Sequence, residues 1–158
     1  MTIHHIINDY NLSLGGAQKV ALNLHTESLN RGLSSKIFGL SRNPLYETKN
    51  AYSLNYSSPY RLIILLKIWR YFRKEVNKGD VIHVHLFPAS LYIAILKISK
   101  LIPKSKLLFT EHSTTNRRRK LFVGRIIDSL TYNAYDNIIA ISQGVFDELQ
   151  RYKPHLSK

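Results

Sequence analysis

Residues 11–20, NLSLGGAQKV, lie between an apolar run at residues 3–8 and an amphipathic run that extends to residue 30. This order predicts a strand, a glycine-containing turn and a helix. The two glycines let the backbone approach a ligand, and the first N–H groups of the helix point at it. The turn can therefore hold a phosphate at Gly15 and Gly16, although the third glycine of a dinucleotide-binding fingerprint is missing. An ordinary connection between a strand and a helix explains the same pattern.

Outward from this turn, the chain alternates strands and helices. Strands are expected at residues 3–8, 35–40, 80–85, 106–112 and 137–142. Helices are expected at residues 16–30, 60–78, 88–101, 121–135 and 143–152, with a loop at 41–59 that includes a short strand at 51–54. The alternation predicts an α/β fold, a Rossmann-like doubly wound parallel sheet with helices on both faces, in a single domain over residues 1–158. Helix 88–101 is apolar almost all round, which predicts that it is buried.

The composition limits the kinds of partner and site. The chain has 23 Lys and Arg against 10 Asp and Glu, a formal net charge of +13, and no cysteine. The positive charge indicates an anionic partner: nucleic acid, an acidic membrane surface or a phosphorylated ligand. The lack of cysteine excludes disulfides, thiolate metal sites and a cysteine nucleophile. No apolar run approaches the roughly 20 residues of a membrane span, and the first residues do not resemble a signal peptide. The expected location is the cytoplasm, or the inner face of the plasma membrane.

Polar residues follow several of the expected strands, at the edge where parallel sheets bind ligands. His85 ends one strand, and Glu111, His112, Ser113 and Thr114 follow another. His112 is a candidate general base or hydrogen-bond donor, and Glu111 either orients another group or pairs with an arginine. The loop that follows adds Asn116 and Arg117 and continues into a basic run to Lys120, which suits an anionic substrate or a lipid headgroup.

His83 and His85 alternate along one strand, so both side chains face the same side of the sheet. With a third histidine nearby they would form a metal site. A hydrogen-bonded core position for His83 is the favoured interpretation, and no metal ion or other cofactor is expected.

Helix 60–78 has one apolar face and one basic face. Its apolar face suits packing on the sheet, and that structural role is favoured. The alternative places Ile63 and Leu66, with the basic residues, on an anionic bilayer. The basic residues of that surface are Lys67, Arg70, Arg73 and Lys74.

Four segments together resemble a known family. GGAQ after the first strand, DVIHVHLF, LLFTEHST and IIAISQGVFDEL occur in the order and spacing of retaining glycosyltransferases of family 4. The resemblance implies one half of a GT-B architecture, the N-terminal acceptor-side domain, and covers residues 3 to about 149. The donor-binding half of that family carries two glutamates in an E-x7-E pattern, which this chain lacks. The chain is therefore expected to be a fragment, a truncated product or one subunit of a split enzyme.

The resemblance also implies roles for individual residues. Gly15 and Gly16 correspond to the loop that contacts the donor phosphate, and His112 to the histidine near the acceptor and the transferred sugar. His85 and loop 113–119 correspond to the acceptor pocket, whereas Gln18 departs from a glutamate that many members carry. The implied reaction transfers a sugar from a nucleotide-sugar donor to a polysaccharide or lipid-linked acceptor in bacterial surface polysaccharide synthesis, such as capsule or lipopolysaccharide. Members of the family generally act without a metal ion.

Three alternatives remain beside this assignment. The isolated domain could bind a glycan or lipid headgroup without catalysing transfer, a role that the missing donor half favours. A nucleic-acid binder fits the charge, but the chain has no recognisable RNA- or DNA-binding motif, so nucleic acid is not the expected partner. A different sugar-nucleotide enzyme with a related fold fits the weak glycine pattern.

Overall fold

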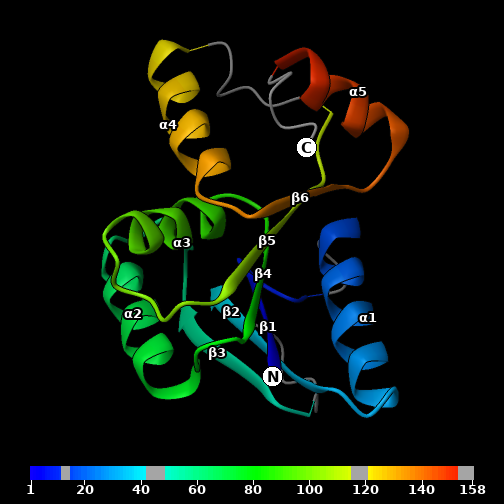
Figure 1. Ribbon diagram of the computed structural model, residues 1–158, viewed down its shortest axis with the longest axis vertical. Coiled ribbons are helices and arrows are strands. Elements are labelled where there is room, and N and C mark those ends of the chain that lie inside the picture. Colours follow the sequence, from blue (N-terminus) through cyan, green and yellow to red (C-terminus); the bar gives the residue numbers. More distant parts are fainter. Residues whose placement is uncertain (12–14, 42–48, 115–120, 153–158) are drawn as a thin grey trace.

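The computed structural model describes residues 1–11, 15–41, 49–114 and 121–152, in which strands and helices alternate (Figure 1). The strands are β1 (Thr2–Ile7), β2 (Ser34–Ser41), β3 (Ala51–Tyr56), β4 (Val81–His85), β5 (Lys106–Glu111) and β6 (Asn137–Ala140). The helices are α1 (Gly16–Asn30), α2 (Ile63–Glu75), α3 (Ala89–Ile98), α4 (Phe122–Asn133) and α5 (Gln143–Tyr152). Every expected element is present, and β3 extends the short strand expected at 51–54 by two residues.

The six strands form one sheet in the order β3-β2-β1-β4-β5-β6, and every neighbouring pair is parallel. The doubly wound α/β fold predicted from the sequence is therefore confirmed. The chain winds outward from β1 to β3, then returns to the other side of β1 to form β4. This reversal between β1 and β4 is the place where such sheets bind their ligands, beyond the carboxyl ends of the strands.

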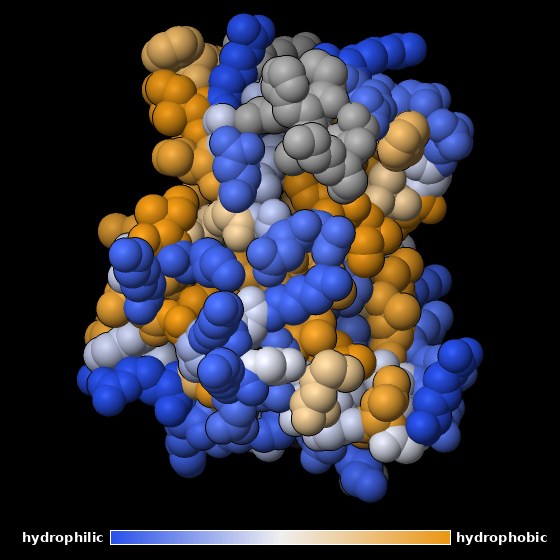
Figure 2. Space-filling model, viewed as in Figure 1, coloured by the Kyte–Doolittle hydropathy of each residue, from blue (hydrophilic) through white to orange (hydrophobic). Residues whose placement is uncertain are grey.

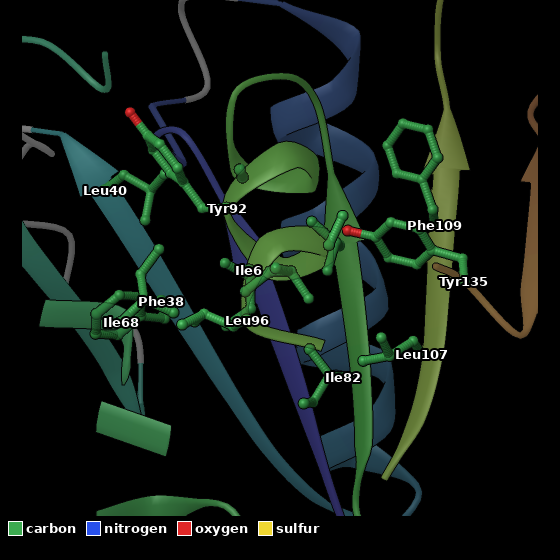
Figure 3. Close-up of a cluster of buried hydrophobic side chains, with 14 of the residues drawn as sticks. Ile6, Phe38, Leu40, Ile68, Ile82, Tyr92, Leu96, Leu107, Phe109 and Tyr135 are labelled. Carbon is green, nitrogen blue, oxygen red and sulfur yellow. The ribbon is translucent and has the colours of Figure 1, made fainter. Parts of the chain in front are cut away.

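The two faces of the sheet have different cores. On one face, α2 and α3 cover a large apolar cluster, which includes Ile6, Phe38, Ile82 and Leu107 (Figure 3). The opposite face is covered by α1, which lies on its own side of the sheet in Figure 1. Its apolar cluster is much smaller and consists of Ile7, Tyr10, Ala21 and Ile37, with a few partly buried neighbours.

Helix α2 packs on the sheet as its pattern predicts, but it is shorter than the expected 60–78. Ile64, Ile68 and Phe72 form its buried stripe. Val76 adopts an extended conformation, and the N–H of Asn77 donates to the Asp80 carboxylate at 2.8 Å. The helix ends at Glu75 because the chain turns here toward β4, instead of continuing to Gly79.

Helix α3 corrects the expectation of a helix buried all round. Tyr92, Ile93 and Leu96 are buried, whereas Ile95 is 37% exposed and Ile98 is 56% exposed. Only one flank of α3 faces the sheet, so its opposite flank carries apolar side chains to the surface.

Candidate functional site

The turn between β1 and α1 lies at the carboxyl edge of the sheet. Gly15 precedes the helix with φ +156° and ψ −176°, a conformation that side chains disfavour. A Cβ atom at Gly15 would lie 3.3 Å from Gln18 Oε1. Gly16 is exposed as the first residue of the helix. Both glycines therefore lie where the N-terminus of α1 can face a ligand.

Helix α1 has a polar buried face. Its buried residues are Gln18, Ala21 and His25, whereas Leu24 is 40% exposed. The Gln18 amide donates to Asp9 Oδ1 at 3.2 Å and so ties the helix to the end of β1. The spacing of three and four residues along this face follows the helical period, but the sequence did not reveal it because two of the three residues are polar.

His85 and His112 meet at the ends of β4 and β5. His85 Nδ1 and His112 Nε2 are 3.3 Å apart, within hydrogen-bonding distance. His85 is fully buried and His112 is half-buried. Burial lowers the pKa of both imidazoles, and that of His85 lies well below its usual value. Both rings are therefore neutral near pH 7, so each keeps a lone pair and an N–H group for chemistry.

Glu111 shapes the start of the loop that carries His112. Its Oε1 atom accepts the backbone N–H groups of His112 and Ser113 at 3.1 Å each. Its Oε2 atom accepts a short hydrogen bond from the Tyr132 hydroxyl in α4. This carboxylate therefore positions the loop through its backbone.

Of the remaining acceptor candidates, the structure describes only Thr114. Thr114 is exposed, and its Cγ2 atom would lie 3.6 Å from a Cβ at Gly144, which places it beside the start of α5. Ser142 caps that helix through a 3.3 Å bond from the Val145 N–H to its Oγ atom. Asn116 and Arg117 lie outside the described residues.

A cluster of histidines extends from this pair beneath α1. His83 Nε2 lies 2.7 Å from Thr110 Oγ1, which confirms the hydrogen-bonded core position favoured from the sequence. The parallel register places His5 of β1 directly beside His83. No described residue bonds either ring nitrogen of His5, although the side chain is buried. Burial lowers the pKa of His5 to about 3 and that of His83 to about 4, so both are neutral.

The geometry of this cluster bears on metal binding. His5, His83 and His85 each offer a nitrogen, and these nitrogens lie within 4.8 Å of one another. A tetrahedral zinc site needs about 3.4 Å between its nitrogen ligands, so small ring movements would bring the three onto one ion. The sequence did not single out His5, because only the strand pairing brings it to His83. The expected absence of a metal ion stays a prediction.

Asn8 is a second residue that the sequence did not single out. Its Nδ2 atom donates to the Phe87 carbonyl at 2.7 Å, and its Oδ1 atom accepts the Ala89 N–H at 3.3 Å. Its carbonyl accepts the N–H groups of Leu40 and Ser41. Asn8 thus joins the ends of β1 and β2 to the turn after β4, where Leu86 has φ +65°. A polar residue that directly follows an apolar strand was the available signal.

The basic face of α2 is largely at the surface. Arg70, Arg73 and Lys74 are exposed, whereas Lys67 is half-buried. Arg73 lies over the Trp69 ring, 5.2 Å from its centroid. Ile63 and Leu66 are 45% and 38% exposed beside these cations. Within the described residues, no helix is both long enough and apolar enough to cross a bilayer.

Comparison with known proteins gives one family. Residues 14–157 match the model of the family described as Glycosyltransferase Family 4. The matched range includes the β1–α1 turn from Gly15 onward, the His85–His112 pair and α5. Among curated proteins, no match is found.

Proposed function

Because the chain belongs to glycosyltransferase family 4, we propose that it is the N-terminal, acceptor-side half of a retaining GT-B enzyme. The complete enzyme would transfer a sugar from a nucleotide-sugar donor to a polysaccharide or lipid-linked acceptor. The observation that carries this proposal is that His112 lies at the carboxyl edge of the sheet, against His85, within a chain of this family. The proposed process is bacterial surface polysaccharide synthesis at the inner face of the plasma membrane.

The β1–α1 turn suits the leaving group of this reaction. As the acceptor hydroxyl bonds to the anomeric carbon, the bond to the nucleotide diphosphate breaks and negative charge develops on the phosphate. The N-terminus of α1 carries partial positive charge, and Gly15 and Gly16 let a phosphate come close to its N–H groups. Preorganised donors of this kind stabilise a developing anion in the transition state.

His112 suits the acceptor side. Its lowered pKa keeps the imidazole neutral, so it can accept a hydrogen bond or a proton from a sugar hydroxyl. His85 holds one of its nitrogens, and Glu111 holds the backbone N–H on the same residue. These two contacts limit how the ring can turn, which is what a positioned catalytic group requires.

The test begins with the coding sequence that follows residue 158, and with neighbouring genes, where an E-x7-E pattern would supply the donor half. Wild-type protein with that half should release nucleotide diphosphate from a sugar donor in the presence of lipid and glycan acceptors. His112→Ala should lower turnover by about 10²–10⁴-fold, the range typical of a lost general acid or base. Its unfolding midpoint should stay close to that of the wild type.

His25→Gln is the matched control, because His25 is a buried histidine whose nitrogens bond Ser35 and the Lys49 carbonyl instead of the pair at the edge. Its turnover should match the wild type. Equal turnover in His112→Ala and wild type would remove His112 from the reaction. If neither a donor half nor transfer is found, a non-catalytic module that binds a glycan or lipid headgroup takes its place.

We also propose that the basic face of α2 docks on an anionic membrane. Arg70, Arg73 and Lys74 are exposed next to the apolar side chains of Ile63 and Leu66, which is the composition of an interfacial helix. Reversing the charge of Lys67, Arg70 and Arg73 to Glu should abolish co-sedimentation with vesicles that contain anionic phospholipid. Sedimentation equal to wild type would leave α2 with its structural role alone.

A further inference from the structure

An open groove lies on the outer surface between α2 and α3. Its volume is ≈430 Å³, within the range of about 300–1,000 Å³ that is usual for ligand sites. Its walls are entirely apolar side chains: Leu62, Leu65, Leu66, Trp69, Leu96 and Leu101. Several of them reach solvent, since Leu62 is 82% exposed and Leu101 is 47% exposed.

The positions of α2 that line this groove differ from the fully buried positions of the same helix. Residues 62, 65, 66 and 69 repeat with the helical period, so they share one face of α2. The core uses a different stripe, formed by Ile64, Ile68 and Phe72. Leu65 and Trp69 also pack against this core, and Leu96 belongs to it, so packing on the sheet explains the inner wall of the groove. It does not explain the exposed Leu62, Leu66 and Leu101. Exposed apolar side chains that line a groove make it a candidate ligand site.

Apolar side chains are also exposed elsewhere on α3 and on α4. Ile95 and Ile98 of α3 are exposed, and α4 adds the exposed Phe122 and Ile126. Figure 2 shows hydrophobic residues over α4 and near the place where α4 meets α3. Exposed apolar side chains therefore occur on α3, which lines one side of the groove, and on α4, which contacts α3.

The charges near the groove are positive. Arg73 lies over the Trp69 ring, and Arg70 is exposed one position along the helix from Trp69. Lys100 and Lys104 are exposed on either side of Leu101. The acidic residues between 61 and 104 are already occupied. Glu75 pairs with Lys36 at 2.6 Å, and Asp80 is buried against His4. An apolar groove with a cationic rim suits a ligand that has a hydrocarbon chain and an anionic head.

We propose that this groove takes the hydrocarbon chain of an anionic membrane lipid. The inference rests on the membrane docking proposed for α2, and it adds a site for one lipid chain to a surface contact. The chain would fill the space along Leu62, Leu66 and Trp69, while the lipid phosphate would stay near Arg70 and Arg73. A bound lipid would then fix the orientation of the domain, since both its head and its chain are held.

The test uses Trp69, which is the one tryptophan of the 158 residues, so its fluorescence reports on the groove alone. Wild-type protein is mixed with vesicles of phosphatidylglycerol whose acyl chains carry bromine, a quencher that acts at contact distance. We expect a blue shift with unbrominated anionic vesicles and strong quenching with brominated ones. Vesicles of neutral phosphatidylcholine should produce neither effect.

Two substitutions provide a matched pair. Leu66→Ser alters the groove and Leu24→Ser alters α1, and the two leucines are 38% and 40% exposed. Helix α1 lies on the opposite side of the sheet from α2 and α3 in Figure 1. Leu66→Ser should weaken the quenching interaction about tenfold, because a buried leucine contact is lost, whereas Leu24→Ser should bind as the wild type does.

Co-sedimentation separates the two proposals. If the protein sediments with anionic vesicles while Trp69 stays unquenched, lipid binding in the groove is contradicted and only membrane docking of α2 remains. Protein that does not sediment overturns both, and sugar transfer is judged by its own assay. Equal losses in Leu66→Ser and Leu24→Ser would also overturn the groove as the lipid site.

Discussion

The two faces of the central strands β1 and β4 carry different kinds of side chain. Toward α2 and α3, β1 and β4 present Ile6, Ile82 and Val84, which are fully buried in the large apolar cluster. Toward α1, the neighbouring positions present His5, His83 and His85. Alternation along a strand thus separates a face that supplies packing energy from a face that keeps polar groups out of water. This face ends at His85, which contacts the candidate catalytic residue His112.

The difference lies in how the polar groups are satisfied. His4 is on the apolar side of β1, but its nitrogens lie 3.1 Å from the Tyr71 hydroxyl and 3.3 Å from the Asp80 carboxylate. His5, one residue later, has no partner among the described residues for either nitrogen. A buried polar group left without a hydrogen bond costs about 1–3 kcal/mol. The α1 face therefore reduces stability next to the His85–His112 pair.

The largest expected effect is on the apolar face. Phe72→Ala in α2 should lower the free energy of unfolding by about 3–5 kcal/mol, because a cavity replaces a fully buried ring. Urea unfolding followed by circular dichroism measures this change. A loss below about 1 kcal/mol would mean that the α2 face is not the main source of stability.

Acid should act mainly through the histidine face. His5 and His83 have folded-state pKa values of about 3 and about 4, below the ordinary value of 6.5. The unfolded chain takes up these protons below pH 6.5 whereas the folded protein does not, so stability falls as the pH falls. Each histidine should lower the free energy of unfolding by about 2 kcal/mol between pH 7 and pH 5, a range in which most carboxylates do not yet titrate.

Unfolding curves at several pH values test this prediction, and His5→Leu is the control. Between pH 7 and pH 5, the free energy of unfolding of this variant should fall less than that of the wild type, by the contribution of one histidine. Stability that stays constant between pH 7 and pH 5 in the wild type would contradict buried neutral histidines.

The smallest effects should separate the two adjacent histidines. His4→Leu should destabilise the protein by about 1–3 kcal/mol, because the Asp80 carboxylate and the Tyr71 hydroxyl both lose their contact with His4. His5→Leu should change the free energy of unfolding by less than about 1 kcal/mol. It removes two unpaired nitrogens and replaces the imidazole by an apolar side chain of similar size. Thermal unfolding of both variants provides the comparison. A larger loss for His5→Leu than for His4→Leu would show that His5 has a partner that stabilises it.

The arrangement of elements could be predicted because each element has a strong local pattern. The apolar run of β1, the glycines before α1 and the amphipathic period of α2 each indicate one kind of structure. The ends were less predictable. Helix α2 stops at Glu75, and the Asn77 N–H donates to the Asp80 carboxylate three residues later. That carboxylate is itself held from β1, by the Thr2 N–H and by His4, which are distant in sequence.

The candidate site could be predicted only in part. Local order along the chain was enough to place His85 and His112 at the binding edge, since each lies at or directly after the end of a strand. The contributions of His5, Asn8 and Gln18 depend on contacts between segments far apart in sequence or on a polar helix face. A polar residue within an apolar strand has no local signature that tells whether it is satisfied.

The amino-acid sequence alone was sufficient for the α/β class, the order of the elements and the residues at the carboxyl edge, because these follow from periodicity and from the chain positions of the strand ends. The tertiary structure decided which histidines meet, which of them lack partners and which apolar stripe of α2 remains open at the surface. Strand register and helix packing determine these features, and both depend on interactions between distant segments. The local pattern therefore indicated a candidate site, and the packing of the sheet determined the protonation and the contacts of its side chains.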